Sequence, residues 1–359
     1  MTENNIHMAG PLLAWYDQNR RILPWREDPT PYHVWLSEIM LQQTRVEAVR
    51  SYYERFLTVL PDIRALAEAP EDQYLKLWEG LGYYSRVRNL HKAAQVIVTE
   101  HEGKMPAEYN ALCKLPGIGP YTAAAIASIA FGKPVPAIDG NLLRVFARLS
   151  FYEENILAPA AAKAAWAFFE ERIHRERPGE FNQALMDLGA LICLPNRAPL
   201  CDQCPLQDAC SAHALGRETE VPFRPAKKKR QIEKMTVLLI HYRDHILLHK
   251  RSASGLLAGL YEFPNTSGWL TREEALREVE ALGLESVRIR KLPAARHIFS
   301  HKEWHMHGYQ VFAGDWQAAE EEAGLAVRDL FLASTEEIET VWSIPSAFRA
   351  YTDIALGQD

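Results

Sequence analysis

The sequence predicts a two-domain protein, with an all-α N-terminal domain followed by a smaller α+β domain. Three observations support this interpretation. A length of 359 residues is that of about two domains, and a hydrophobic fraction of 48% is sufficient for two cores. The apolar residues follow a helical period from about residue 8 to residue 215. After Lys234 the pattern changes to that of strands.

The N-terminal part is expected to be helical throughout. Helix starts are marked by Thr30-Pro31 and by Pro106-Ala107-Glu108, since capping residues and proline favour the first turn. From the apolar periodicity we expect helices over residues 8–20, 31–40, 45–58, 71–78, 86–101, 107–114, 121–131, 141–150, 159–174 and 181–192.

A connector is expected over residues 222–233, because Pro222, Pro225 and the basic run 227–230 do not pack into a core. The basic run is more typical of a solvated tether beside DNA phosphates than of a nuclear-localisation signal. The predicted domains are therefore residues 1–221 and 234–359. In the second domain we expect a hairpin of strands 235–242 and 245–250, a helix near 271–282, and strands near 286–292, 296–299 and 303–313.

Composition narrows the functional classes. The net charge of −6 argues weakly against a nucleic-acid partner, but a local cationic face is enough to bind phosphates. The longest small-apolar run, Ala123 to Phe131, is too short to cross a bilayer. The start from Met1 to Asn5 has neither a secretory leader nor an organelle presequence, so we expect a cytosolic protein without a membrane span.

Four of the five cysteines, Cys193, Cys201, Cys204 and Cys210, fall within one short stretch. In a cytosolic protein this clustering favours a metal site over disulfides or incidental buried thiols. Spacing alone does not separate a structural zinc site from a [4Fe-4S] cluster, because both accept four cysteines.

Two further motifs point to DNA and to acid chemistry. The stretch Leu115 to Thr122 places Gly117 and Gly119 between two short helices, where free N–H groups at a helix start suit a phosphate oxygen. A plain turn between packed helices is the alternative. Asp139 precedes a predicted helix start and Glu38 lies among apolar residues, so the alternatives for these acids are a helix cap and a surface acid.

Several of these motifs resemble those of a known protein family. The segment Met186 to Ala190, the hairpin, and the stretch Val135 to Asn141 resemble the endonuclease III superfamily. From about Leu12 to His301 the chain resembles the MutY-type adenine DNA glycosylases. The resemblance implies a helix-hairpin-helix glycosylase domain, with a six-helix module near 29–135 and a cluster module from 1–28 and 136–221, and then a Nudix-like domain. It implies that the four cysteines hold [4Fe-4S], although seven residues separate Cys193 from Cys201 where the family usually has six.

The resemblance also implies the chemistry. Breaking the bond between adenine and its sugar requires a proton for the base and negative charge beside the cationic sugar. Glu38 matches the general acid and Asp139 the residue that stabilises the sugar cation, while Tyr121 and Asn141 match positions that orient this pair. Lyases of the superfamily carry a Schiff-base lysine where this chain has Tyr121, so we expect a monofunctional glycosylase that leaves the strand uncut.

Base recognition is implied in the same way. Gln43 and Tyr83 match an intercalating pair, and Trp25, Arg26, Leu41 and Gln183 match a pocket for the flipped adenine. Phe299, Ser300 and His301 resemble a loop that recognises 8-oxoguanine, with Ser300 as its hydrogen-bonding partner. The expected partner is double-stranded DNA with A:8-oxoguanine or A:G mispairs, bound by a monomer in a prokaryotic cytoplasm.

Three alternative functions have discriminating features. An endonuclease III-like lyase would require a lysine in place of Tyr121. A redox sensor or a DNA-binding module without chemistry would have no use for the paired acids Glu38 and Asp139. A nucleotide diphosphatase would require the paired glutamates of the Nudix box, which the stretch Arg277 to Leu282 lacks.

Overall fold

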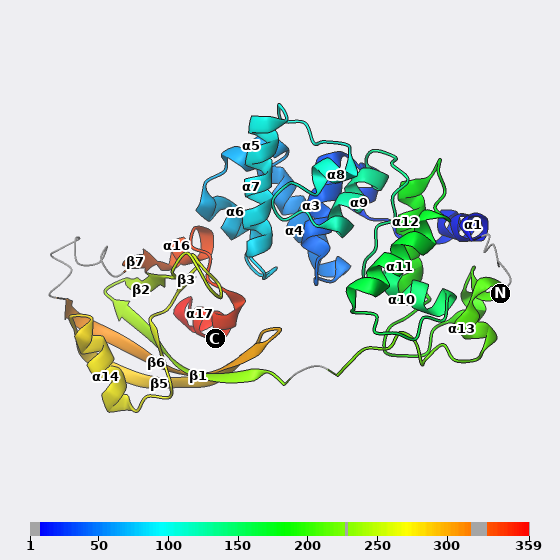
Figure 1. Ribbon diagram of the computed structural model, residues 1–359. Helices are drawn as coiled ribbons and strands as arrows, with labels where there is room; N and C mark the ends of the chain where they lie inside the picture. Colours follow the sequence, from blue (N-terminus) through cyan, green and yellow to red (C-terminus); the bar gives the residue numbers. More distant parts are fainter. Residues whose placement is uncertain (1–7, 227–228, 317–328, 359) are drawn as a thin grey trace. The chain divides into compact units, whose positions relative to one another are not determined.

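The computed structural model describes residues 8–226, 229–316 and 329–358 (Figure 1). Expectations for Met1 to Asn5 and for Lys227 and Lys228 therefore lie outside the described residues. Backbone contacts divide the chain into two compact units. The N-terminal unit holds the chain up to Ala69 together with Arg86–Ala226, and the C-terminal unit holds Pro70–Ser85 together with the chain beyond Ala226.

The N-terminal unit is helical, as the sequence predicts. Each helix range expected from the sequence contains a helix, and the short helices α2, α5 and α13 were not expected. The elements are α1 (Ala9–Asn19), α2 (Pro24–Glu27), α3 (Pro31–Leu41), α4 (Val46–Val59), α5 (Ile63–Glu68), α7 (Ser85–Glu100), α8 (Tyr109–Leu112), α9 (Pro120–Ile129), α10 (Gly140–Leu149), α11 (Pro159–Glu170), α12 (Pro178–Leu191), the 3₁₀ turns η1 (Cys201–Gln203) and η2 (Gln207–Ala209), and α13 (Ser211–Ala214).

Helix α12 lies at the centre of this unit and packs against α1, α9 and α10. Two glycines allow the close approach. A Cβ on Gly179 would lie 2.7 Å from the Ile129 Cα, and one on Gly189 would lie 2.7 Å from the Asn141 Cβ. The apolar residues between these helices form one core, which fixes the positions of the loops that line the site.

The described part of the C-terminal unit contains a seven-stranded mixed sheet in the order β3-β2-β1-β6-β5, with β4 paired to β1 and β7 paired to β2. Strands β1 and β6 are parallel, while β5 and β6 are antiparallel. The elements are α6 (Glu71–Trp78), β1 (Gln231–Tyr242), β2 (His245–Lys250), β3 (Tyr261–Glu262), β4 (Asn265–Ser267), α14 (Arg272–Ala281), β5 (Leu284–Ile298), β6 (Lys302–Trp316), β7 (Leu330–Ser334), α16 (Thr335–Thr340), η3 (Ser346–Phe348) and α17 (Arg349–Ala355).

Each face of the sheet has its own core. Leu238 and Ile240 of β1 belong to the cluster that includes Val279 of α14, whereas Val237 and Leu239 belong to the cluster that includes Tyr351 of α17. This alternation is the period-two pattern of a strand buried on both faces. Among the described residues, no helix combines the length and the apolar character that crossing a membrane requires.

The structure changes two of the strand expectations. Strand β1 begins at Gln231, inside the segment expected as a connector, because its first residues pair with the start of β6. The expected strands 286–292 and 296–299 are one strand, β5, with an irregularity between Leu292 and Ala295. Pro293 lies in this interval and cannot donate to the ladder, so a bulge lets the strand continue past it. The hairpin around Arg243 is confirmed, with Tyr242 opposite His245.

Candidate active site

Helix α3 positions the first candidate acid. The Thr30 side chain caps it by accepting from the backbone N–H of His33, and Pro31 occupies the first turn. The helix is buried from Val34 to Met40, so Glu38 lies inside the unit with only 6% of its surface exposed. The alternative of a surface acid is therefore wrong.

Burial dominates the titration of Glu38. It raises the pKa of this carboxyl from 4.5 to about 7, since the charged form is poorly solvated. The hydroxyl of Tyr121 donates to its Oε2 and lowers the pKa, the charge of Asp139 raises it, and Arg26 lowers it. A carboxyl in this position holds its proton up to neutral pH, which is what a general acid requires.

Asp139 is both a helix cap and a wall of the same pocket. Its Oδ1 accepts from the backbone N–H groups of Asn141 and Leu142, at 2.8 and 2.7 Å, at the start of α10. Its Oδ2 accepts from the Asn141 side chain at 2.9 Å. Burial raises the pKa of this carboxyl, and these hydrogen bonds oppose the effect. The cap alternative is therefore correct, and it does not exclude a catalytic role, because the capped carboxylate still borders the pocket.

One cavity of about 480 Å³ brings most of the predicted residues together. Glu38 and Asp139 both line it. So do the other residues that the sequence assigned to catalysis and to the base pocket: Tyr121, Asn141, Trp25, Arg26, Leu41, Gln43 and Gln183. A cavity of this size accommodates a nucleobase with its sugar and keeps two carboxyl groups beside one ligand.

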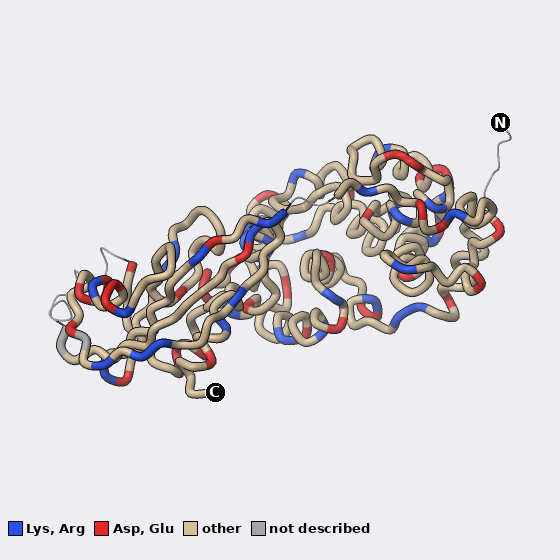
Figure 2. Tube along the Cα trace, turned by 90° about the horizontal axis from the view of Figure 1, so that it is seen from below, with Lys and Arg blue, Asp and Glu red and all other residues tan. Residues whose placement is uncertain are grey.

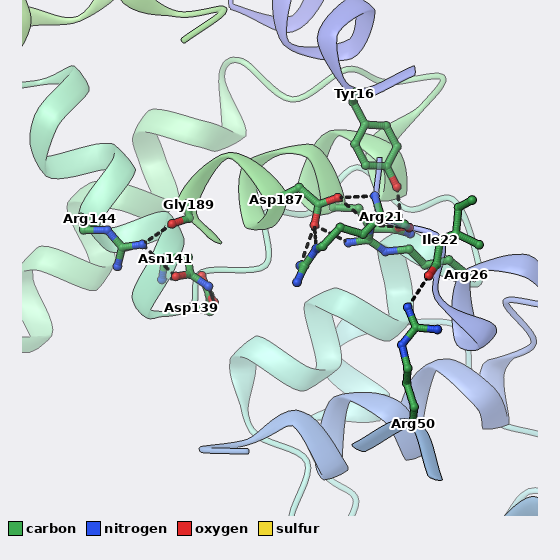
Figure 3. A network of polar contacts seen from close by, with 11 residues as sticks. Tyr16, Arg21, Ile22, Arg26, Arg50, Asp139, Asn141, Arg144, Asp187 and Gly189 are labelled. Atoms are coloured by element: carbon green, nitrogen blue, oxygen red, sulfur yellow. Dashed lines mark hydrogen bonds and ion pairs between the residues drawn. The ribbon is translucent and has the colours of Figure 1, made fainter. Parts of the chain in front are cut away.

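A buried ionic network beside the pocket was not predicted from the sequence. Asp187 of α12 is fully buried, and Figure 3 shows Arg21 and Arg26 converging on it. The Arg26 guanidinium donates to both carboxylate oxygens of Asp187, at 2.7 and 2.9 Å, and Arg21 Nε donates at 2.7 Å. Tyr16 donates to Gln183 Oε1 at 2.7 Å. These contacts fix the two polar side chains of the predicted base pocket, Arg26 and Gln183.

Asn141 is held from its other side. Its Oδ1 accepts from Arg144 at 2.9 Å, and Arg144 also donates to the carbonyl group of Gly189 at 2.6 Å (Figure 3). A third contact of Arg144, at 2.7 Å, is with the carbonyl group of Cys193. The Asn141 amide therefore has a fixed orientation, with its nitrogen toward Asp139. Arg144 itself was missed by sequence reasoning, because its partners are remote in the chain.

The turn at the C-terminal end of α3 is held from within the unit. Arg86 of α7 donates to the carbonyl groups of Ile39, Met40 and Gln42. Gln43, which follows, is exposed and has a φ of 60°.

Tyr83, in the C-terminal unit, also has a left-handed backbone, with a φ of 50° and 46% of its surface exposed. Such conformations are uncommon away from glycine and occur often at functional sites.

The predicted phosphate hairpin lies between α8 and α9. Gly117 has a φ of 72°, and a Cβ there would lie 2.5 Å from the Asn89 Cβ, so this position requires glycine. Gly119 has an ordinary φ and open space around its Cα, so steric constraint does not explain it. It begins α9 without a side-chain cap, which leaves the amide end of this helix available to an anion.

The charged residues of the two signs are not segregated along the chain. Figure 2 shows cationic and anionic residues interspersed along the trace. The cavity lining nevertheless includes Arg21, Arg26 and Arg45. The lining also includes the acids Glu38, Glu47 and Asp139, so cationic and anionic groups meet at this pocket.

The four clustered cysteines line one small cavity with Arg148, which donates to the Cys193 Sγ at 3.2 Å. Burial raises the pKa of Cys204 to about 12 and that of Cys201 to about 11. Among the described residues, three metal-binding groups lie within 4.8 Å of one another only at Cys201, His213 and Glu218, so no three of the four cysteine sulfurs are that close. The four thiols around one cavity are consistent with a four-cysteine metal centre.

In the C-terminal unit, Phe299, Ser300 and His301 form the turn between β5 and β6. Ser300 is exposed, and its Oγ lies 3.3 Å from His301 Nδ1. Phe299 packs against Trp304 with ring centroids 4.8 Å apart. The stretch compared with a Nudix box lies on α14, and its acids Glu278 and Glu280 are exposed and belong to no cluster of potential metal ligands within the described ranges.

Comparisons with known proteins agree with this two-part architecture. A model described as "HhH-GPD superfamily base excision DNA repair protein" matches residues 36–171, and one described as "NUDIX domain" matches residues 235–353. The chain is 35% identical over 352 residues to the adenine DNA glycosylase of Homo sapiens, covering 81% of this chain and 64% of that protein. It is 36% identical over 294 residues to the adenine DNA glycosylase of Buchnera aphidicola subsp. Baizongia pistaciae, covering 81% and 82%.

A solved structure is also similar to the N-terminal part of the chain. It is titled a thermostable thymine-DNA glycosylase and is 30% identical, with a TM-score of 0.53. The match covers 57% of this chain and 94% of that one. The likeness therefore concerns the helical unit.

Proposed function

The chain belongs to the adenine DNA glycosylase family, and from this premise we propose that it removes adenine mispaired with 8-oxoguanine or guanine from double-stranded DNA. The reaction is hydrolysis of the N-glycosidic bond in base excision repair. The observation that carries the proposal is the pocket lined by both Glu38 and Asp139, in which Glu38 keeps its proton up to neutral pH.

The two acids divide the chemistry. Protonated Glu38 donates to N7 of the extruded adenine, and the bond between C1′ and N9 breaks with its electrons going to the base. The positive charge left on the sugar is stabilised by anionic Asp139, whose lone pairs are oriented by Asn141 and by the start of α10. Water then adds to C1′, and its proton returns to Glu38. The products are free adenine and an abasic site.

Tyr121 supports a monofunctional reaction. Its hydroxyl is engaged with Glu38, and a phenol cannot form an imine with the opened sugar. A lyase step of the endonuclease III kind would require an amine at this place. The strand is therefore left intact after the base is released.

Separate residues are proposed to support extrusion of the adenine and to hold the extruded base. Gln43 and Tyr83 are proposed to fill the space that the flipped adenine leaves, since both are exposed on left-handed turns. Trp25 and Leu41 provide apolar walls for the base, and Arg26 and Gln183 provide polar contacts. The turn that contains Gly117 and Gly119 binds a backbone phosphate at the start of α9.

The opposite base is assigned to the C-terminal unit. 8-Oxoguanine has an N–H at position 7 where guanine has only an acceptor. The exposed Ser300 hydroxyl accepts from that N–H, with Phe299 and His301 on either side holding the turn in place. Diphosphate hydrolysis is not proposed for this unit, because the stretch Arg277 to Leu282 lacks the paired trailing glutamates that would bind a divalent cation.

We assign a [4Fe-4S] cluster to Cys193, Cys201, Cys204 and Cys210. The support is the four-thiol donor set around one cavity, the Arg148 donor beside Cys193, and the family to which the chain belongs. Bound there, the cluster would cross-link the loop after α12 through its four thiolates, beside Arg148 of α10, which donates to Cys193. The protein is further proposed to act as a monomer in the cytoplasm of a prokaryote.

The test is base release from a duplex with a single A:8-oxoguanine pair. We expect free adenine by chromatography and strand cleavage only after alkali treatment. Sodium borohydride should trap no covalent adduct, because an imine is required for trapping. Borohydride trapping, or release of a damaged pyrimidine in place of adenine, would contradict the proposal and support the lyase alternative.

A further inference from the structure

The segment Pro70–Ser85 belongs to the C-terminal unit although it lies within the N-terminal half of the sequence. Its helix α6 is attached to the end of α16. The Lys76 ammonium donates to the carbonyl oxygens of Ile338 and Trp342, at 3.0 and 3.1 Å. A cation at this position complements the negative end of a helix and satisfies carbonyl groups that lack partners inside the helix.

A second set of contacts follows immediately in the chain. Glu79 forms an ion pair with Lys76 at 2.7 Å and accepts from the backbone N–H of Ile344 at 2.8 Å. Ser343 is 1% exposed, and its hydroxyl donates to the Leu75 carbonyl and lies 3.4 Å from the Tyr84 hydroxyl. The segment is thus held along its length by residues 338–344.

The segment ends in the proposed wedge. Tyr83 lies between Gly82, with a φ of 69°, and Tyr84, which is 5% exposed and in contact with Ser343. The backbone of Tyr83 is therefore followed on its C-terminal side by a buried neighbour, while 46% of the surface of Tyr83 itself is exposed. A movement of Ser343 relative to α6 would displace this turn.

Two aromatic contacts connect the proposed 8-oxoguanine loop to Phe348, which follows residues 338–344 in the chain. The ring of Phe299 packs on Trp304 at 4.8 Å, and Trp304 packs on Phe348 at 5.7 Å. Phe348 lies in η3, which follows Ile344 by a single proline. All of these residues except the exposed loop belong to one core cluster, in which a displacement at one end requires neighbours to repack.

We propose that α6 and the turn after it transmit recognition of the opposite base from the Phe299–His301 loop to the wedge residue Tyr83. The route runs through Trp304, Phe348 and the Ser343-Ile344 backbone to Glu79 and Lys76. This inference rests on the proposed function, because it takes Ser300 as the sensor and Tyr83 as the wedge. Lys76 and Glu79 act as positioning residues, since they reach the DNA only through Tyr83.

The test is a double-mutant cycle, because spatial continuity alone does not demonstrate coupling. Single-turnover release of adenine is measured opposite 8-oxoguanine and opposite guanine, and extrusion is followed by the fluorescence of 2-aminopurine in place of adenine. The variants are Lys76→Met, Ser300→Ala and both together. Glu79→Gln is a second way to break the contact if Lys76→Met fails to fold, and Gln73→Met, on the exposed side of α6, is the matched control.

We expect Lys76→Met to slow extrusion and release opposite 8-oxoguanine by about fivefold or more, with little change opposite guanine. Ser300→Ala should have the same effect, and the double variant should be no slower than either, because both interrupt one route. Gln73→Met should match the wild type. Equal losses opposite both bases, or effects of Lys76→Met and Ser300→Ala that multiply, would overturn the inference.

Measurements on the wild-type protein distinguish a failure of the proposed function from a failure of this inference. A wild-type protein that releases no adenine, or that has no preference for the oxidised partner, contradicts the proposed function and this inference with it. A wild-type preference that persists in Lys76→Met and in Glu79→Gln overturns the inference alone and leaves the function standing.

Discussion

Replacing Glu38 with glutamine should remove activity and at the same time stabilise the fold at high pH. Burial raises the pKa of Glu38 from 4.5 to about 7, so the folded protein holds this proton more tightly than the unfolded chain does. The corresponding contribution to stability is complete below pH 4.5 and is lost as the pH rises to about 7. At about 1.4 kcal/mol for each pH unit, the loss amounts to about 3 kcal/mol.

Glutamine has nearly the same shape as glutamate and does not ionise. The stability of Glu38→Gln therefore does not decrease with pH for this reason. We expect the free energy of unfolding of the variant, relative to the wild type, to increase by about 3 kcal/mol between pH 4.5 and pH 7. Urea titrations at several pH values measure this difference. Adenine release in a single turnover should fall by about two orders of magnitude or more, because the proton donor is lost. The wild-type rate itself should fall about tenfold for each pH unit above 7.

Glu68→Gln is the matched control, because Glu68 is an exposed acid on α5 of the same unit. It should leave the rate unchanged and should not increase in stability relative to the wild type as the pH rises. A stability difference for Glu38→Gln that does not vary with pH would refute the claim that burial governs this carboxyl. Release of adenine by Glu38→Gln at the wild-type rate would refute its assignment as the acid.

Three further substitutions test other parts of the site. Tyr121→Phe removes the hydrogen bond that lowers the pKa of Glu38, so the fall in rate should move to higher pH, as measured by single-turnover rates between about pH 6 and pH 9. Gly189→Ala places a Cβ 2.7 Å from that of Asn141 and should cost about 1–3 kcal/mol in urea titrations while slowing base release. Cys204→Ser should lose most of the bound iron and sulfide, as measured by elemental analysis and visible absorbance.

Matched controls exist for these substitutions. Gly10→Ala introduces a methyl group where nothing lies within 4 Å, so it should not destabilise the fold. Cys113 lies outside the cysteine cluster, and Cys113→Ser should retain iron. Full iron content in Cys204→Ser would contradict the assignment of this thiol as a ligand. A profile for Tyr121→Phe that moves to lower pH would contradict the hydrogen-bond argument.

The long helices could be predicted because each of them repeats its apolar pattern over several turns. The helices α2, α5 and α13 contain only four to six residues, which is less than two helical periods, and their sequences carry no periodicity to detect. For the same reason the strands β3 and β4, of two and three residues, were missed. Their positions are set by pairing with longer strands rather than by local pattern.

The candidate site was predictable where a local motif carries it and not where partners meet across the fold. Glu38 and Asp139 lie in recognisable stretches of sequence. The Asp187 network joins residues that are 161 to 166 positions apart, and nothing local distinguishes Asp187 from an acid on a helix surface. The grouping of Pro70–Ser85 with the C-terminal unit is equally invisible, because α6 has the periodicity of any amphipathic helix.

The Asp187 network bears on the electrostatics of the two proposed catalytic acids. In the proposed reaction the pocket would hold an adenine and a phosphate-bearing sugar, for which the cation of Arg26 is favourable, but a guanidinium beside Glu38 also lowers the pKa of that carboxyl. Asp187 accepts two hydrogen bonds from Arg26, and the same carboxylate also pairs with Arg21, so its one negative charge is shared between two cations. Among the groups that shift the pKa of Glu38, Arg26 has a smaller effect than burial, Tyr121 or Asp139. Because burial outweighs the effect of Arg26, Glu38 keeps its proton beside this cation, as the proposed reaction requires.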